Sequence, residues 1–147
     1  MHIENEIVEQ VAQMVFSTML GIDLFPQSDH EAADYNWMQA GVRISGPWNA
    51  SVSIKLSPSL AEVSAHRMLN SGDDLTLLDQ EEVALELANQ IGGNLKSILP
   101  APSVLSIPST RNPELTPTPV VMIQNEVWLG GPEGNLQVQV VLMDNGC

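Results

Sequence analysis

Residues 78–100 read LDQEEVALELANQIGGNLKSILP. At about 100° of rotation per residue, the apolar side chains of this stretch fall on one broad arc, which predicts a helix with one buried face. These side chains are those of Val83, Leu87, Ala88, Ile91, Leu95 and Ile98. Asp79, with Glu82 three residues later, resembles a capping box, and Pro100 and Pro102 would end the helix. We therefore expect a long amphipathic helix here, on which the rest of the chain packs.

The opposite face of the same helix gathers polar residues and a glycine. Within an arc of roughly 60° lie Glu82, Glu86, Asn89 and Gly93. The Glu86 carboxylate and the Asn89 amide are three residues apart, so they are neighbours that point toward solvent. Taken alone, such a pair is most simply the solvated face of an amphipathic helix.

Two adjacent glycines, Gly92 and Gly93, interrupt the helix. A glycine inside a helix costs roughly 0.5–1 kcal/mol relative to alanine, so their presence needs a physical reason. One reason is close packing against a neighbouring element. The other is a docking surface around Glu86 and Asn89, where the missing side chain of Gly93 lets another molecule approach.

The segments before this helix predict further helices and a hairpin. Residues 4–20 have the apolar spacing of a helix with one buried face, and residues 57–69 begin with a Ser-Pro helix start. Residues 37–45 and 49–56 alternate polar and apolar side chains around a Gly-Pro turn. We expect these two strands to form a hairpin with one face in solvent.

The last third of the chain is strand-like, and its strands are separated by Asn, Gly and Pro. The expected strands are residues 104–107, 119–124, 126–129 and 135–143, with a turn at residues 130–134. The whole sequence predicts an α+β fold in which a mostly antiparallel sheet carries helices on one face. At 147 residues, we expect one domain over residues 1–147.

The charge of the chain limits its partners. Five Lys and Arg stand against 18 Asp and Glu, which gives a formal net charge of −13. Such an acidic surface repels nucleic-acid phosphates and anionic lipid, so we expect no nucleic-acid and no membrane partner. The sequence has no run of about 18 apolar residues and no basic, apolar leader, so we expect a cytoplasmic protein.

The sequence offers little evidence for a metal site or a catalytic nucleophile. The only cysteine is Cys147, and His2, His30 and His66 are scattered through different segments without carboxylates at ligand spacing. No serine or cysteine lies in a nucleophile motif such as GxSxG. We expect no metal and no cofactor of the protein's own.

The run Glu86-Leu-Ala-Asn89-Gln-Ile-Gly-Gly93-Asn-Leu resembles the ExxN signature helix of the CheX-type chemotaxis phosphatases, relatives of CheC and FliY. The order of the preceding helices and strands is similar to that family, and Pro108 looks like the family's proline after the signature helix. The resemblance covers most of the chain loosely and residues 81–99 densely. It implies the same fold.

The resemblance also implies an activity, which is hydrolysis of the aspartyl phosphate of a CheY-like response regulator. Glu86 and Asn89 align with the family's catalytic glutamate and asparagine. Asn89 would hold a water in line with the phosphorus, and Glu86 would pair with the regulator's lysine. Mg²⁺ would be held by the regulator's own acids. Glu82 and Gly93 would contact the partner, although Glu82 is more simply part of the helix cap.

Some features depart from the family pattern or remain open. CheC-type members carry two ExxN helices, whereas the first helix here has Glu9-Gln-Val-Ala12, so at most one site is expected. The interval from Asn89 to Pro108 is slightly short for the family, and Asn94 lies toward the flank, where a local hydrogen bond is the simpler role. Family members of this type dimerise by joining sheets edge to edge. We expect a homodimer here through the strand at residues 135–143, as an exposed edge.

Two alternatives to the phosphatase follow from the same residues. The first is a catalytically inactive CheX-like adaptor that binds a response regulator or another signalling partner without turnover. The second is a structural module like the middle domain of flagellar switch proteins. An adaptor should tolerate Asn89→Ala, whereas a phosphatase should not.

Overall fold

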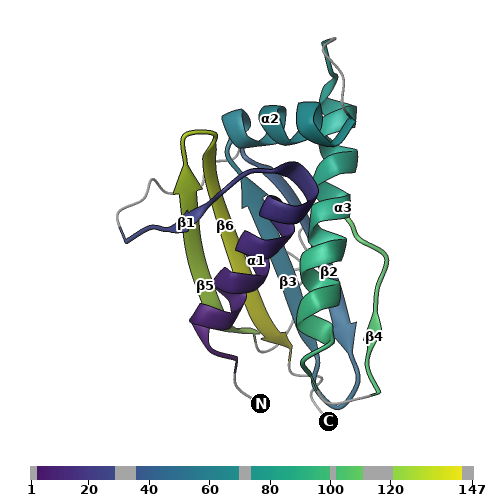
Figure 1. Cartoon of the computed structure of the whole chain (residues 1–147). Coiled ribbons are helices and arrows are strands. Elements are labelled where there is room, and N and C mark those ends of the chain that lie inside the picture. The colour runs from purple at the N-terminus through teal and green to yellow at the C-terminus, as the bar shows by residue number, and fades with distance from the viewer. Residues whose placement is uncertain (1–2, 29–35, 70–73, 100–101, 111–120, 144–147) are drawn as a thin grey trace.

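A six-stranded antiparallel sheet with three helices on one face forms the computed structural model of the chain (Figure 1). The structure describes residues 3–28, 36–69, 74–99, 102–110 and 121–143. The elements run α1 (Asn5–Leu20), β1 (Phe25–Pro26), β2 (Met38–Ser45), β3 (Ala50–Leu56), α2 (Pro58–Leu69), α3 (Leu77–Lys96), β4 (Val104–Leu105), β5 (Val121–Gly131) and β6 (Gly134–Met143). The strand order is β1-β5-β6-β3-β2-β4, which confirms the α+β fold expected from the sequence.

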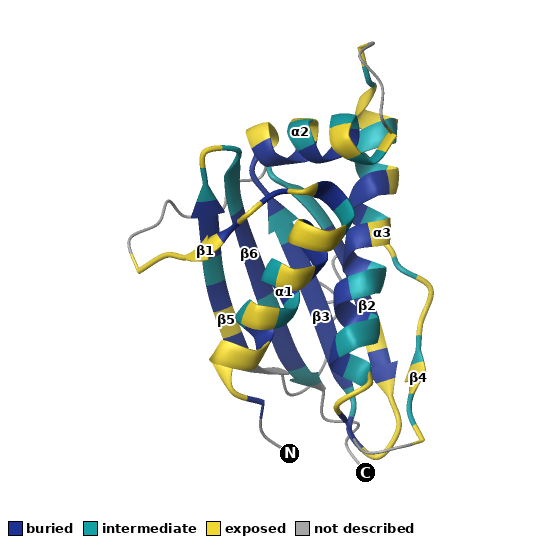
Figure 2. Cartoon of the chain, viewed as in Figure 1, coloured by how far each residue is buried: buried dark blue, intermediate teal, exposed yellow. Residues whose placement is uncertain are grey.

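The core lies between the helices and the face of the sheet that they cover. Figure 2 shows the buried stripes of α1 and α3 turned toward the strands. Side chains that alternate along the strands meet these stripes, as expected of a sheet with one face in the core. Representative fully buried side chains are Phe16, Ile22, Ile54, Leu60, Leu87, Ile91, Leu95 and Leu136. The core therefore fixes the rotation of α3 about its own axis.

The helix ends are closed by local hydrogen bonds. Gly21 ends α1 with a left-handed backbone (φ 65°), a conformation that glycine adopts without steric cost. The Arg67 guanidinium, from α2, donates to the carbonyl oxygens of Leu20 at 3.0 Å and Gly21 at 3.2 Å. Ser57 accepts from the Leu60 backbone at 3.4 Å, so it caps α2 as the sequence predicts.

The hairpin of β2 and β3 forms with the expected pairing, from Met38 opposite Leu56 to Ile44 opposite Ala50. The expectation that one face of both strands lies in solvent is wrong for β3, because Ser51 is fully buried and Ser53 is 3% exposed. β3 is an internal strand between β2 and β6, where Ser51 is paired with Arg43 and Val141, and Ser53 with Gly41 and Gln139.

The last two strands differ from the expectation in two ways. Residues 119–124 and 126–129 were expected as separate strands, but from Val121, where the described residues resume, β5 is continuous, with a register shift between Ile123 and Asn125. A bulge of this kind bends a strand without ending it. The strand at residues 135–143 was expected as an exposed edge, yet β6 is internal, paired with β5 on one side and β3 on the other. Alternation of polar and apolar residues does not distinguish these two positions.

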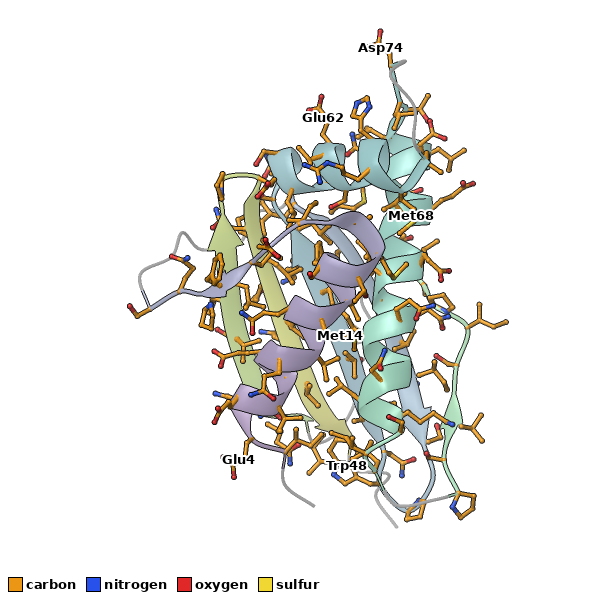
Figure 3. The ribbon with its side chains drawn as sticks, viewed as in Figure 1. Glu4, Met14, Trp48, Glu62, Met68 and Asp74 are labelled. Carbon is orange, nitrogen blue, oxygen red and sulfur yellow. The ribbon has the colours of Figure 1, made fainter. Side chains whose placement is uncertain are left out.

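The tryptophans pack at different places on the sheet. Trp48 is 8% exposed and lies at the end of the sheet where β2 turns into β3 (Figure 3). Trp37 and Trp128 meet edge to face, with ring centroids 6.3 Å apart and an interplanar angle of 78°. Such T-shaped contacts are favourable for aromatic rings. These tryptophans therefore act as packing anchors.

Candidate functional site on helix α3

A capping box holds the N-terminus of α3, one turn earlier than the sequence suggested. The Asp79 backbone donates to the Thr76 hydroxyl at 3.2 Å, and the Thr76 backbone donates to the Asp79 carboxylate at 2.8 Å. The expected pair of Asp79 and Glu82 is therefore wrong. Leu77 and Leu78, in the first turn, are exposed, so that the apolar pattern does not reveal this start. Glu82 therefore lies within α3 instead of at its cap, and its side chain is exposed.

The C-terminus of α3 also corrects one expectation. Ile98 was placed on the buried arc, but the helix ends at Lys96, and the Ile98 side chain is 51% exposed. After Lys96 the backbone tightens into i→i+3 hydrogen bonds, from Ile98 to Leu95 at 3.2 Å and from Leu99 to Lys96 at 3.1 Å, so the rotation of about 100° per residue no longer sets the direction of later side chains. The other expected members of the buried arc, from Val83 to Leu95, are buried.

Gly92 marks the closest approach of α3 to the sheet. A β-carbon at this position would overlap the Val42 side chain of β2 and lie 3.3 Å from Leu105 Cδ1 of β4. Gly92 itself is buried. Close packing therefore explains this glycine, which was one of the two reasons offered by the sequence.

Gly93 lies in different surroundings. A β-carbon there would meet Leu105 Cδ2 at 3.9 Å, which is ordinary van der Waals contact. The position is half-buried, and its backbone is not in the left-handed region. Among the described residues, therefore, neither a steric clash nor the backbone conformation requires a glycine at position 93.

The polar face of α3 places the predicted site residues together. Glu82 and Glu86 are exposed, and Asn89 and Gly93 are half-buried, on the side of the helix turned away from the core. Figure 2 shows this outer side of α3 in teal and yellow. The face is acidic in its first half, and Lys96 in the last turn is the helix's one basic residue.

Hydrogen bonds order part of this face. The Gln90 amide donates to Glu86 Oε1 at 3.0 Å, one turn apart on the helix. The Asn94 amide donates to the Gln90 carbonyl at 2.8 Å, which confirms the local role expected for Asn94. The side chain of Asn89 makes no hydrogen bond to any described residue. An amide in this state can bind water or a partner through both its oxygen and its nitrogen.

Sequence reasoning missed two neighbours of this face. Gln90 was not recognised as the partner of Glu86, although the i, i+4 spacing of an amide and an acid is a usable signal. The contact of Leu105 with the glycines is between segments distant in the chain, so no local signal could reveal it. Pro108 lies half-buried in the same segment as Leu105, along the edge of β2.

The part of the chain that the structure describes contains no candidate metal site. Residues 3–28, 36–69, 74–99, 102–110 and 121–143 contain no group of three or more His, Cys, Asp and Glu side chains that could hold an ion. His2, His30 and Cys147 lie outside the described residues. No helix among the described residues has the length and apolar character needed to cross a membrane.

The comparisons with known proteins agree with this architecture. The model of the family described as chemotaxis phosphatase CheX matches residues 38–120, which is more than half of the chain and includes all of α3. A comparison with curated protein sequences finds no significant match.

Several solved structures share the fold. CheX from Desulfovibrio desulfuricans is 21% identical, with 93% of this chain and 97% of that chain covered and a TM-score of 0.69. CheX from Vibrio vulnificus is 16% identical, with 92% and 95% covered and a TM-score of 0.70. The CheX-CheY-BeF3-Mg²⁺ complex from Borrelia burgdorferi contains a chain that is 17% identical, with 97% and 100% covered and a TM-score of 0.68. These structures show the same fold, and the family model establishes that the chain belongs to the CheX family of chemotaxis phosphatases.

Proposed function

We propose that this protein is a phosphatase that hydrolyses the aspartyl phosphate of a CheY-like response regulator in the cytoplasm. Its family is described as chemotaxis phosphatase CheX, and a structure of similar fold is a complex of CheX with CheY, BeF3 and Mg²⁺. The observation that carries the proposal is that Glu86 and Asn89 lie three residues apart on the outer face of α3. Glu86 accepts a hydrogen bond from Gln90, whereas the Asn89 amide makes no hydrogen bond to any described residue.

Asn89 is proposed to position the attacking water. Its amide oxygen would accept a hydrogen bond from a water whose oxygen then forms a bond to phosphorus. The phosphorus–oxygen bond to the aspartyl carboxylate breaks, the carboxylate leaves with the bonding electrons, and inorganic phosphate takes up the protons of the water. An acyl phosphate is already activated, so positioning and electrostatics supply most of the required catalysis. A neutral amide does this without placing a second negative charge beside the phosphoryl group.

Glu86 is proposed to orient the regulator through a charge pair with the lysine of its active site. The Gln90 amide holds Oε1 of Glu86, so the carboxylate has a preferred direction and its other oxygen remains for a partner. The Mg²⁺ that offsets phosphate charge belongs to the regulator in this proposal, and the protein supplies no cofactor.

Gly93 and Glu82 are proposed to contact the regulator on either side of this pair. Gly93 follows Asn89 by one turn, and no contact with another described residue explains its missing side chain. We infer that the missing side chain leaves room for the partner's backbone. Glu82 precedes Glu86 by one turn on the exposed face, where it adds negative charge to the rim of the interface.

The proposal includes a homodimer formed through sheet edges. β6 cannot supply this edge, because both of its sides are paired. β5 offers a longer edge, since β1 pairs with it at Leu129 and Gly130 within the described residues, and β5 itself spans Val121–Gly131. Sedimentation equilibrium should give about twice the chain mass of 15.9 kDa.

The experiment that tests the phosphatase is a dephosphorylation assay on the CheY-like regulators of the same organism. Each regulator is charged with a small-molecule phosphodonor, freed of donor, and incubated with wild-type protein or Asn89→Ala. We expect one regulator to lose phosphate much faster with the wild type, and the variant to be slower by about 100-fold, as for the loss of one positioning group.

Asn94→Ala is the matched control, because it removes the same kind of side-chain amide from the same helix, and the Asn94 amide donates to the Gln90 carbonyl of α3 itself. It should retain activity within a few-fold of the wild type. Equal activity of Asn89→Ala and the wild type would refute the proposed role of Asn89. Binding of a regulator without any acceleration would instead establish the adaptor.

A further inference from the structure

The segment that follows α3 forms a fixed strip along the edge of β2. The Ser106 backbone donates to the Arg43 carbonyl at 2.9 Å, and the Arg43 backbone donates to the Ser106 hydroxyl at 2.8 Å. Gly41 and Ser109 exchange backbone hydrogen bonds of 2.8 and 2.9 Å. Because both ends of residues 106–109 are bonded to β2, the side chains between them are presented from an anchored backbone.

This strip also packs on the polar half of α3. Leu105 lies against both helical glycines: a β-carbon at Gly92 would be 3.3 Å from its Cδ1, and one at Gly93 would be 3.9 Å from its Cδ2. Gly93 follows Asn89 by four residues and so lies on the same face of the helix. The strip of residues 104–109 therefore borders the face that carries Glu86 and Asn89.

The direction of the strip brings Ile107 level with Asn89. Figure 1 shows that the chain runs from β4 back alongside α3, toward the start of that helix. Two residues of extended chain advance about 6–7 Å, and a helix rises about 1.5 Å per residue. Ile107 therefore lies about four helical residues before the glycines. Proline at position 108 favours extended backbone at Ile107. The strip holds one residue more than β2 between the pairs Leu105–Ile44 and Ser109–Gly41, so side chains do not alternate strictly there, and Ile107 is turned to solvent.

Ile107 is 88% exposed, the highest exposure among the large apolar side chains of the described residues. A single exposed apolar residue is ordinary on a protein surface and by itself indicates nothing. Here the exposed isoleucine is anchored on both sides, lies beside the acidic face of α3, and belongs to a strip without charge, since residues 102–110 contain no Asp, Glu, Lys or Arg. An acidic face and an uncharged apolar strip thus lie side by side.

We infer that Ile107 is a docking contact for the response regulator and helps to determine which regulator is bound. The occupant is the regulator's surface beside its acyl phosphate, with a basic group opposite Glu86 and an apolar patch opposite Ile107. This inference rests on the proposed function. Charge complementarity sets which side of the partner faces α3, and the apolar contact adds affinity and selects among regulators that share the same phosphorylation chemistry.

The test measures binding separately from turnover. Wild-type protein and Ile107→Ser are titrated with the regulator carrying BeF3⁻ and Mg²⁺, and the KM and kcat of dephosphorylation are measured for both. Burying an isoleucine supports at least a tenfold change in affinity, so the variant should bind at least about tenfold more weakly and show a matching rise in KM. The kcat at saturating regulator should stay within about twofold.

Two further variants make the result specific. Ile107→Leu keeps the apolar area and should bind within a few-fold of the wild type. Phe25→Ser removes an apolar side chain that is 57% exposed on β1, at the other edge of the sheet, and should bind as the wild type does. Thermal unfolding of each variant checks that the fold is retained.

The inference is overturned if Ile107→Ser binds and turns over the regulator like the wild type. It is also overturned if the variant changes the sedimentation mass while KM stays constant, because a second copy of the chain would then be the occupant. Failure of the proposed function has a different signature: the wild type would bind the BeF3⁻ regulator, with or without dependence on Ile107, but would not accelerate loss of phosphate.

Discussion

At the scale of single residues, the two adjacent glycines of α3 have opposite surroundings. An alanine at position 92 would overlap Val42, whereas an alanine at position 93 would make an ordinary contact with Leu105. We expect Gly92→Ala to lower the free energy of unfolding by about 1–3 kcal/mol, as overpacking does. Gly93→Ala should raise it by about 0.5–1 kcal/mol through helix propensity. Chemical denaturation of both variants measures these signs.

The Gly93→Ala variant also separates an effect on stability from an effect on docking. If Gly93 leaves room for the regulator, Gly93→Ala should be more stable than the wild type and yet have a higher KM for dephosphorylation. A stabilised variant with an unchanged KM would show that the regulator does not approach at this position.

Glu86→Gln tests the negative charge of Glu86 by itself, because the new side chain keeps an oxygen that can accept the hydrogen bond from Gln90. The variant should raise KM while changing kcat less, since it removes a docking charge and leaves Asn89 in place. Added salt should weaken regulator binding by the wild type more than binding by the variant, because salt screens the charge pair. Glu82→Gln, one turn earlier on the same exposed face, is the matched control and should have the smaller effect on both measurements.

At the scale of elements, α3 depends on the capping box at its start. Thr76→Ala removes the hydroxyl that accepts from the Asp79 backbone and should lower the free energy of unfolding by about 1 kcal/mol. Thr18→Ala is the control, because its hydroxyl bonds only to the carbonyl and sulfur of Met14 within α1 and caps nothing. Equal losses in the two variants would show that the capping box does not stabilise α3.

At the scale of the whole molecule, the strand order predicts a gradient of local stability. β3 and β6 are paired on both sides, whereas β1 and β4 are two-residue strands at the edges. Backbone amides of β3 and β6 should exchange with solvent most slowly, and those of β1 and β4 fastest, in native-state hydrogen exchange. Fast exchange throughout β6 would contradict its internal position and restore the edge strand expected from the sequence.

The sequence by itself determined the elements whose signals are local. The two faces of α3, the Glu86–Asn89 pair, the hairpin of β2 and β3 and the resemblance to the family depend on residues a few positions apart, because helical and strand periodicity set side-chain direction. Boundaries were less well determined. The capping box was expected at Asp79 instead of Thr76, because a cap depends on backbone hydrogen bonds and exposed leucines obscure the first turn, and Ile98 was wrongly placed on the buried arc.

Only the tertiary structure decided which elements are neighbours. The internal position of β6, the burial of Ser51, the contact of Gly92 with Val42 and the strip that carries Ile107 beside α3 all join residues far apart in the chain. Alternation gives a strand its two faces but not its place in the sheet, because strand order depends on long-range packing. The candidate site residues could thus be named from one helix, and their chemistry stays a prediction, whereas the surface around them depends on the packing of the whole sheet.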